Sequence, residues 1–419
     1  MVTLDKVNAS NGTDPHTDRT PGPAAADPAA GPAAGESAAT AVDRLDLRAD
    51  PVELTAALVD IPSVSRDEAR IADAVEAAVR AVAGEVNATG EFPAITVERV
   101  RHNIIARTNR GFGQRVILAG HLDTVPIADN VPSRRGADAE GRDTLFGCGA
   151  VDMKSGDAVY LHAFAMLAGA AELTRDLTLI MYEAEEIEAK YNGLKYLAEH
   201  RADLLEGDIA LLGEPSGNVI EAGCQGIVTA RVTARGTRAH AARSWLGDNA
   251  VNRLLPVLDR VVAYTARTAE VDGLTYREGL QIVRVDAGVA LNVIPDEATA
   301  HVNFRYAPDR TADGALAHLG EVLAIDDPLI DVEIVDAIPG AAPGLSHPAA
   351  RELVEVAGGV VKPKFGWTDV SRFAAMGVPA VNFGPGDPAF CHKRDEQIPV
   401  HMIGDLYRDL HRYLTTPAG

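Results

Sequence analysis

Histidine and acidic side chains recur in five short segments of this 419-residue chain, after apolar stretches or within glycine-rich loops. In chain order the segments contribute His121 with Asp123, Asp152, the pair Glu185 and Glu186, Glu214, and His392. Nitrogen and oxygen donors without a thiolate suit zinc, cobalt or manganese. Three carboxylates would offset much of the charge of two divalent ions. These residues therefore predict a catalytic site that holds two divalent metal ions.

Spacing within the segments indicates separate tasks. His121 and Asp123 are separated by one residue, so we expect His121 to bind metal and Asp123 to hold its other ring nitrogen. The acidic run 183–188 follows an apolar strand, where like charges repel one another without a cation. One of two adjacent carboxylates can bind metal while its neighbour manages a proton. The glycine-rich loop 147–156 could instead cradle phosphate, but the order Gly-Lys followed by Ser or Thr is absent.

Apolar strands alternate with helices around these segments. Their expected ranges are strands at 103–108, 115–120, 177–183 and 209–212, and helices at 70–82 and 157–173. Short apolar strands between helices favour an α/β sheet that is covered on both faces. In such sheets ligands bind at the carboxyl ends of the strands, which is where most of the candidate residues stand.

A different pattern occupies the stretch 229–338. Its order is strand, helix, strand, strand, helix, strand, which is the ferredoxin-like α+β arrangement. We expect one α/β domain, formed by 45–228 and 339–419, with this second domain inserted into it. Residues 1–44, rich in Ala, Pro and Gly, are expected to be a disordered tail.

The charge balance excludes several classes of function. The formal net charge is −21, which argues against nucleic acid and against an anionic membrane surface as partners. The sequence has no apolar run long enough for a membrane span and no apolar signal core at its start. Three widely spaced cysteines are too few for a disulfide scaffold. A cytoplasmic protein is expected.

The order of the motifs resembles one enzyme family. Between about residues 50 and 415 the chain carries GHLDTVP, GAVDMKSG, EAEE, GEPS, GTRAHAARSWLGDNA, LNVIPDEA and FGPGDPAFCHKRDE. They are similar to the dinuclear zinc-dependent deacylases and exopeptidases, which include succinyl-diaminopimelate desuccinylases, acetylornithine deacetylases and glutamate carboxypeptidases. The resemblance implies a zinc-peptidase-like sheet domain with an inserted ferredoxin-like domain through which two copies dimerise.

The resemblance also implies a role for each candidate. Asp152 would bridge two zinc ions, and the full ligand set would be His121, Asp152, Glu186, Glu214 and His392. Glu185 would be the general base that takes a proton from the attacking water, and Asp123 would orient His121.

Further residues are implied by the motifs of the inserted domain and the C-terminal part. His240, supplied by the partner subunit, would stabilise the oxyanion. Carboxylates of the substrate would be bound by Arg305, Asn292 and Thr368.

The implied activity is hydrolysis of a linear amide, with N-succinyl-L,L-2,6-diaminopimelate as the favoured substrate in lysine and diaminopimelate biosynthesis. Acetylornithine deacetylation and carboxypeptidase or dipeptidase activity stay open as alternatives, because the same ligands serve them all. A co-catalytic aminopeptidase would lack the inserted GTRAH motif. A catalytically silent binding homologue is the alternative from another class, and the intact ligands and base argue against it. Val151, Ser155 and the acidic motif EAEEIEAKYNG depart from the usual family pattern and leave substrate choice open.

Overall fold

The computed structural model describes residues 43–417. The predicted tail at 1–44 therefore lies outside the described residues, apart from its last two positions. Of these, Asp43 pairs with Arg70 at 2.6 Å and so belongs with the folded region.

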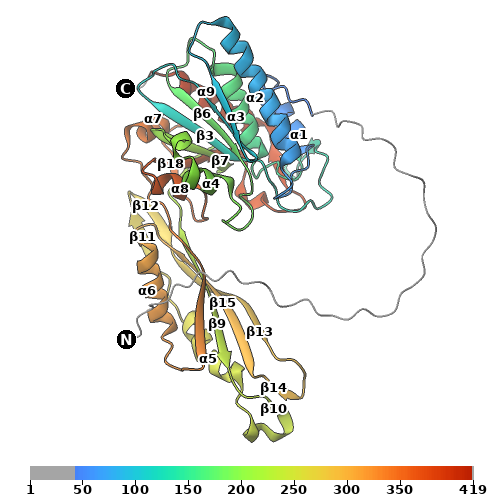
Figure 1. Ribbon diagram of the computed structural model, residues 1–419, viewed down its shortest axis with the longest axis vertical. Helices are drawn as coiled ribbons and strands as arrows, with labels where there is room; N and C mark the ends of the chain where they lie inside the picture. The colour runs from blue at the N-terminus through green and yellow to red at the C-terminus, as the bar shows by residue number, and fades with distance from the viewer. Residues whose placement is uncertain (1–42, 418–419) are drawn as a thin grey trace, which may run out of the picture. The chain divides into compact units, whose positions relative to one another are not determined.

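The largest sheet of the described residues has eight strands, and its strands β3 and β7 contain the candidate ligands His121 and Glu214 (Figure 1). Its strands lie in the spatial order β1-β2-β6-β3-β7-β18-β8-β17. Their bounds are β1 Thr96–Val100, β2 Asn103–Arg107, β3 Arg115–His121, β6 Asp176–Tyr182, β7 Ile209–Pro215, β8 Ile220–Ala222, β17 Val361–Pro363 and β18 Ala380–Gly384. Strand β3 is parallel to β6 and β7, and β7 is parallel to β18. The carboxyl ends of these adjacent strands therefore meet at one edge of the sheet.

Helices cover both faces of this sheet, as the sequence predicts. Side chains of β3 alternate between two hydrophobic clusters, with Leu118 in one and Ile117 in the other. The cluster with Leu118 includes residues of α1 Pro51–Val59, α2 Ala69–Thr89, α3 Lys154–Leu167, α7 Pro348–Val356 and α9 Val400–Thr415. The cluster with Ile117 includes residues of α4 Gly193–His200, the 3-10 helix η1 Ala202–Leu205 and α8 Val370–Ala375.

The predicted bounds of two helices were wrong. Helix α3 begins at Lys154, earlier than the expected 157, and it ends at Leu167, before Gly169. Helix α2 continues to Thr89 and ends where Gly90 takes a left-handed conformation with a φ of 66°. The longer N-terminal turn of α3 matters for the site, because it follows directly on Asp152.

The inserted stretch forms a second, four-stranded antiparallel sheet with the order β13-β15-β9-β16. Its elements are β9 Gly226–Arg235, α5 Ala250–Val262, β13 Gly279–Ala287, β15 Glu297–Tyr306, α6 Ala312–Leu323 and β16 Ile330–Ile338. Alternate residues of β9 are buried with residues of α5 and α6 in a core of their own. This is the predicted strand and helix order, and Figure 1 shows both helices beside this sheet.

Several short elements were not predicted from the sequence. The inserted region also holds the hairpin β11 Thr268–Val271 and β12 Leu274–Arg277, the two-residue strands β10 Ala239–His240 and β14 Val293–Ile294, and the 3-10 helix η2 Ala241–Leu246. A three-stranded sheet joins β4 Arg134–Ala137, β5 Asp143–Phe146 and β19 Gln397–Pro399. Because β19 pairs with β5, the C-terminal motif is held beside the loop that carries Asp152.

Within residues 43–417, none of the helices combines the length and the apolar composition needed to cross a bilayer.

Candidate metal centre

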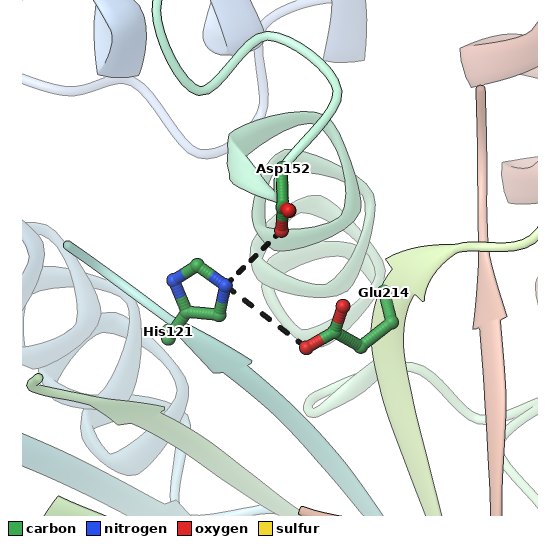
Figure 2. A group of neighbouring side chains, drawn as sticks. All are labelled: His121, Asp152 and Glu214. Carbon is green, nitrogen blue, oxygen red and sulfur yellow. Dashed lines mark hydrogen bonds and ion pairs between the residues drawn. The ribbon is translucent and has the colours of Figure 1, made fainter. Parts of the chain in front are cut away.

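Three of the predicted ligands converge at the carboxyl ends of β3 and β7. His121 is the last residue of β3, and its Nε2 lies 3.3 Å from Asp152 Oδ1 and 4.0 Å from Glu214 Oε1. Asp152 comes from the loop before α3 and Glu214 from β7, and Figure 2 shows the three side chains pointing toward one another. His121 is fully buried and Glu214 nearly so.

A second group shares Asp152 with the first. His392 Nε2 lies 3.3 Å from Asp152 Oδ2 and 3.0 Å from Glu186 Oε1. Each group offers three donor atoms that all lie within 4.8 Å of one another. Ligands about 2.0–2.1 Å from a tetrahedral zinc ion are roughly 3.4 Å apart, so these separations need little adjustment around an ion. Asp152, with one oxygen toward each histidine, is placed to bridge two sites.

Glycines allow the ligand-bearing elements to approach closely. A Cβ on Gly156, in the first turn of α3, would lie 2.0 Å from the carbonyl oxygen of Gly213, the residue before Glu214. A Cβ on Gly120, the residue before His121, would lie 1.8 Å from Asp157 Oδ1. The contact at Gly156 is with backbone, so the close packing of α3 on β7 requires glycine there, whereas a side chain at position 120 would have to displace the buried Asp157 carboxylate.

Asp123 holds the loop that carries the Glu185–Glu186 pair. Its two carboxylate oxygens accept hydrogen bonds from the backbone N–H of Glu185 at 3.0 Å and of Glu186 at 3.2 Å. The Ser65 hydroxyl donates to the same carboxylate at 2.7 Å. His121 Nδ1 donates a hydrogen bond to the carbonyl oxygen of Asp123 at 3.0 Å, whereas the Asp123 carboxylate is 3.5 Å from this nitrogen. Asp123 thus contacts His121 mainly through its backbone and fixes the acidic loop through its side chain.

Glu396 supports Asp152, a role that the sequence analysis missed. Its buried carboxylate accepts hydrogen bonds from the backbone N–H of Val151 at 2.9 Å, Asp152 at 3.0 Å and Gly149 at 3.0 Å. Burial raises the pKa of Glu396 to about 7, although the three donors oppose this shift. Glu396 lies a few residues after His392 in the same motif, and this position could have suggested a role in the site. Only the fold shows what its carboxylate contacts.

The electrostatics of the cluster favour a cation. Burial opposes ionisation of Asp152, but hydrogen bonds from His121 and His392 lower its pKa below the usual range. Hydrogen bonds to Asp152 and Glu186 raise the pKa of His392 to about 10. Burial, followed by the charge of Asp152, raises the pKa of Glu214 to about 8. The groups that bind protons in this cluster are the same groups that could bind divalent ions, so protons and metal would compete for them.

Glu185 lies in the same electrostatic environment. Burial raises its pKa well above the ordinary value, and the charge of Glu214 adds to this effect. A carboxylate with a raised pKa is suited to accept and return a proton near neutral pH.

The fold does not bring the remaining predicted residues into these two groups. His240 and Asn292 lie in neighbouring segments of the inserted region instead: β10 pairs with β14, His240 opposite Val293, and Ala241 N–H donates to the Asn292 carbonyl at 2.8 Å. Strand β9 is ten residues long, about 30 Å, and His240 follows the end that is remote from β8. Arg305 Nε donates to Asn303 at 3.0 Å, and the buried Thr368 hydroxyl donates to Asn382 at 2.9 Å.

Comparison with known proteins agrees with the fold and identifies a family. A sequence model of peptidase family M20/M25/M40 matches residues 117–416. A Mycobacterium tuberculosis protein, provisionally named succinyl-diaminopimelate desuccinylase DapE, is 55% identical over 370 residues, covering 88% of this chain and 99% of that protein. The succinyl-diaminopimelate desuccinylase of Corynebacterium glutamicum is 52% identical over 373 residues, covering 88% and 98%.

A solved structure shows the same fold. YXEP of Bacillus subtilis, described as a dinuclear metal-binding peptidase of family M20, matches with a TM-score of 0.60 at 15% sequence identity. The match covers 88% of this chain and 98% of that one.

Proposed function

The chain belongs to peptidase family M20/M25/M40 and is a hydrolase that acts on an amide bond, and from this premise we propose that its substrate is N-succinyl-L,L-2,6-diaminopimelate. The products would be succinate and L,L-diaminopimelate, so the enzyme would serve lysine and diaminopimelate biosynthesis. The observation that carries the proposal is the pair of ligand groups that share Asp152, with Glu185 beside them. The names of relatives at 52% and 55% identity support the choice of substrate.

We propose two zinc ions as the cofactor, with cobalt or manganese as substitutes. His121 and Glu214 would hold one ion, Glu186 and His392 the other, and Asp152 both. The donors are imidazole nitrogen and carboxylate oxygen, which suits these metals. Bound at this place, such ions polarise a carbonyl group and make water a stronger nucleophile.

The chain's own residues would manage the proton. Glu185 would take a proton from the attacking water onto its carboxylate and later deliver it to the amide nitrogen as the C–N bond breaks. Asp123 would keep Glu185 in position, because its carboxylate accepts the Glu185 backbone N–H at 3.0 Å. Replacing Glu185 should therefore stop turnover without removing a metal ligand.

We further propose a homodimer that forms through the inserted domain and supplies His240 to the partner's metal centre. Trp245 is 77% exposed, and Leu291 is fully exposed, so the region around His240 presents large apolar side chains. His240 is itself exposed and could stabilise the oxyanion across a subunit boundary. Arg305 and Asn292 of this domain, together with Thr368, remain proposed contacts for substrate carboxylates. A cytoplasmic location is proposed with the biosynthetic role.

A panel of substrates tests the activity. Zinc-reconstituted protein should hydrolyse N-succinyl-L,L-2,6-diaminopimelate with a higher kcat/KM than N-acetylornithine or dipeptides. A preference for the acetylated substrate or for peptides would refute the proposed substrate and favour a sister activity of the family.

Hybrid dimers test the shared site. Mixing inactive His240→Ala and Glu185→Ala chains should restore part of the activity, because one hybrid site then holds both native residues. Subunit exchange without any recovery of activity would contradict the shared site.

A further inference from the structure

Lys364 is a largely buried lysine near the candidate metal centre, and the proposed mechanism gives it no role. Lys364 directly follows β17, and its side chain is only 12% exposed. The ammonium Nζ lies 2.9 Å from Glu221 Oε2 in the neighbouring strand β8. It also donates to the carbonyl oxygen of Pro215 at 3.4 Å. Since Pro215 directly follows Glu214, this contact places a positive charge next to a predicted metal ligand.

The surroundings keep Lys364 charged. Burial alone lowers the pKa of its ammonium, but the charges of Glu221, Glu214 and Asp152 outweigh burial and raise it above the ordinary value. Asp152 and Glu214 both belong to the candidate ligand groups, so the charge of Lys364 acts on the centre itself.

Lys154, a second buried lysine, differs from Lys364 in its hydrogen-bond partners. Lys154 Nζ donates to the carbonyl oxygens of Leu58 at 3.0 Å and Ile61 at 2.9 Å, both outside the centre. Lys154 is therefore used to join helix α1 and the following loop to α3. Lys364 has one firm partner and one long contact among residues 43–417, while an ammonium has three N–H donors. Lys364 thus keeps a donor for a further acceptor.

An anionic substrate needs such a group. The chain carries a net charge of −21, so a substrate with several carboxylates is repelled by the protein as a whole and must be held by local cations. In a succinyl amide two methylene groups separate the free carboxylate from the scissile carbonyl. That carboxylate must therefore lie a few ångströms from the metal centre, whereas an acetyl group presents no charge there.

We propose that Lys364 binds the free carboxylate of a dicarboxylic acyl group and is a specificity-determining residue for succinylated over acetylated amides. This inference rests on the proposed function, since it concerns the acyl side of the same amide substrate. Glu221 holds the ammonium in place, and the carboxylate of the acyl group completes its hydrogen bonds.

Four variants separate substrate recognition from simple neutralisation of Glu221. In Lys364→Gln, the KM for the succinylated substrate should rise about tenfold to a hundredfold, the loss expected for a hydrogen bond between charged groups, with a much smaller change in kcat. Glu221→Gln keeps a side-chain oxygen that can still accept a hydrogen bond from the ammonium, so its KM should rise less than that of Lys364→Gln. The double variant should keep the high KM of Lys364→Gln, and Lys364→Arg should recover part of the affinity.

The opposite results would overturn the inference. If Lys364 only neutralises Glu221, the double variant should regain the wild-type KM. An equal rise in KM for succinylated and acetylated substrates would also contradict a role in reading the acyl carboxylate. Thermal stability and bound metal are measured on every variant, so that a folding or metal defect is recognised.

A direct binding measurement keeps this inference separate from the choice of substrate. Succinate alone is titrated calorimetrically into zinc-reconstituted wild type, Lys364→Gln and Glu221→Gln. A larger loss of succinate binding in Lys364→Gln than in Glu221→Gln supports the lysine site even if turnover shows a different physiological amide. Equal binding in all three proteins refutes the site even if the wild type proves to be a desuccinylase.

Discussion

Replacing Glu396 by Gln should weaken metal binding although Glu396 is not a ligand. The wild-type carboxylate accepts three backbone N–H groups of the loop that ends in Asp152, at 2.9, 3.0 and 3.0 Å. A glutamine keeps one oxygen, which can still accept from Val151 and Asp152. Its amide group instead points a donor at the N–H of Gly149, so one hydrogen bond is lost and a buried donor is left unpaired.

The magnitude follows from these contacts. A hydrogen bond to a charged group contributes about 1.5–3 kcal/mol, and a buried donor without a partner costs about 1–3 kcal/mol. Part of this loss lowers the free energy of unfolding. The rest weakens metal binding, because Asp152 is held less firmly in position. Groups that hold a metal ligand in place typically change metal affinity by about 10–100-fold when they are mutated. We expect a decrease in this range for Glu396→Gln, because Asp152 belongs to both ligand groups.

Chelator competition with zinc measures this effect, and unfolding of the metal-free protein measures the stability term separately. Asp395→Asn is the matched control, because Asp395 is the exposed neighbour of Glu396 in the same loop. The control should bind zinc like the wild type. Wild-type zinc affinity and turnover in Glu396→Gln would refute the view that this carboxylate positions Asp152.

Further predictions concern proton transfer and pH. Glu185→Gln should keep its bound metal by elemental analysis but lose about 10²–10⁴-fold in kcat, and near-normal turnover would exclude Glu185 as the base. Zinc affinity should fall as pH is lowered from 9 to 6, because the pKa of His392 is raised to about 10 and protons then compete with metal; a pH-independent affinity in chelator competition would contradict this. Asp157→Asn should stabilise the metal-free protein: both carboxylate oxygens of Asp157 are buried without a hydrogen bond among the described residues, and burial raises its pKa well above the ordinary value. Because the unfolded state releases this proton at lower pH than the folded state, wild-type stability falls as pH rises above about 4, by at most about 1.4 kcal/mol per pH unit. The gain from Asp157→Asn in thermal unfolding should thus be larger at pH 8 than at pH 5, and a gain that shrinks with pH would refute this reasoning.

Local patterns predicted much of this fold because they reflect burial. Strand β3 is almost wholly buried and is continuously apolar from Val116 to Gly120, so its position could be predicted. Strand β4 is largely exposed and polar, and its pairing with β5 depends on contacts that no local pattern reveals. The ligands could be predicted because several carboxylates at the ends of buried strands repel one another, and a bound cation removes this repulsion.

Supporting residues were harder to predict than ligands. Glu396 and Lys364 contact residues that are distant in sequence, and an isolated Glu or Lys in a loop is ordinarily a solvated side chain. The assignment of Asp123 was also incomplete, since its carboxylate holds the backbone of Glu185 and Glu186 while its carbonyl faces His121. Such hydrogen bonds depend on loop geometry, which the sequence alone does not specify.

Metal stoichiometry in single ligand variants tests the central claim most directly. The two groups share Asp152 and otherwise differ, so titration followed by elemental analysis should find two tightly bound zinc ions in the wild type. His121→Ala and His392→Ala should each keep one tight ion, and Asp152→Ala should keep neither at wild-type affinity. Loss of only one ion in Asp152→Ala, with the other bound as tightly as in the wild type, would contradict a bridged dinuclear centre.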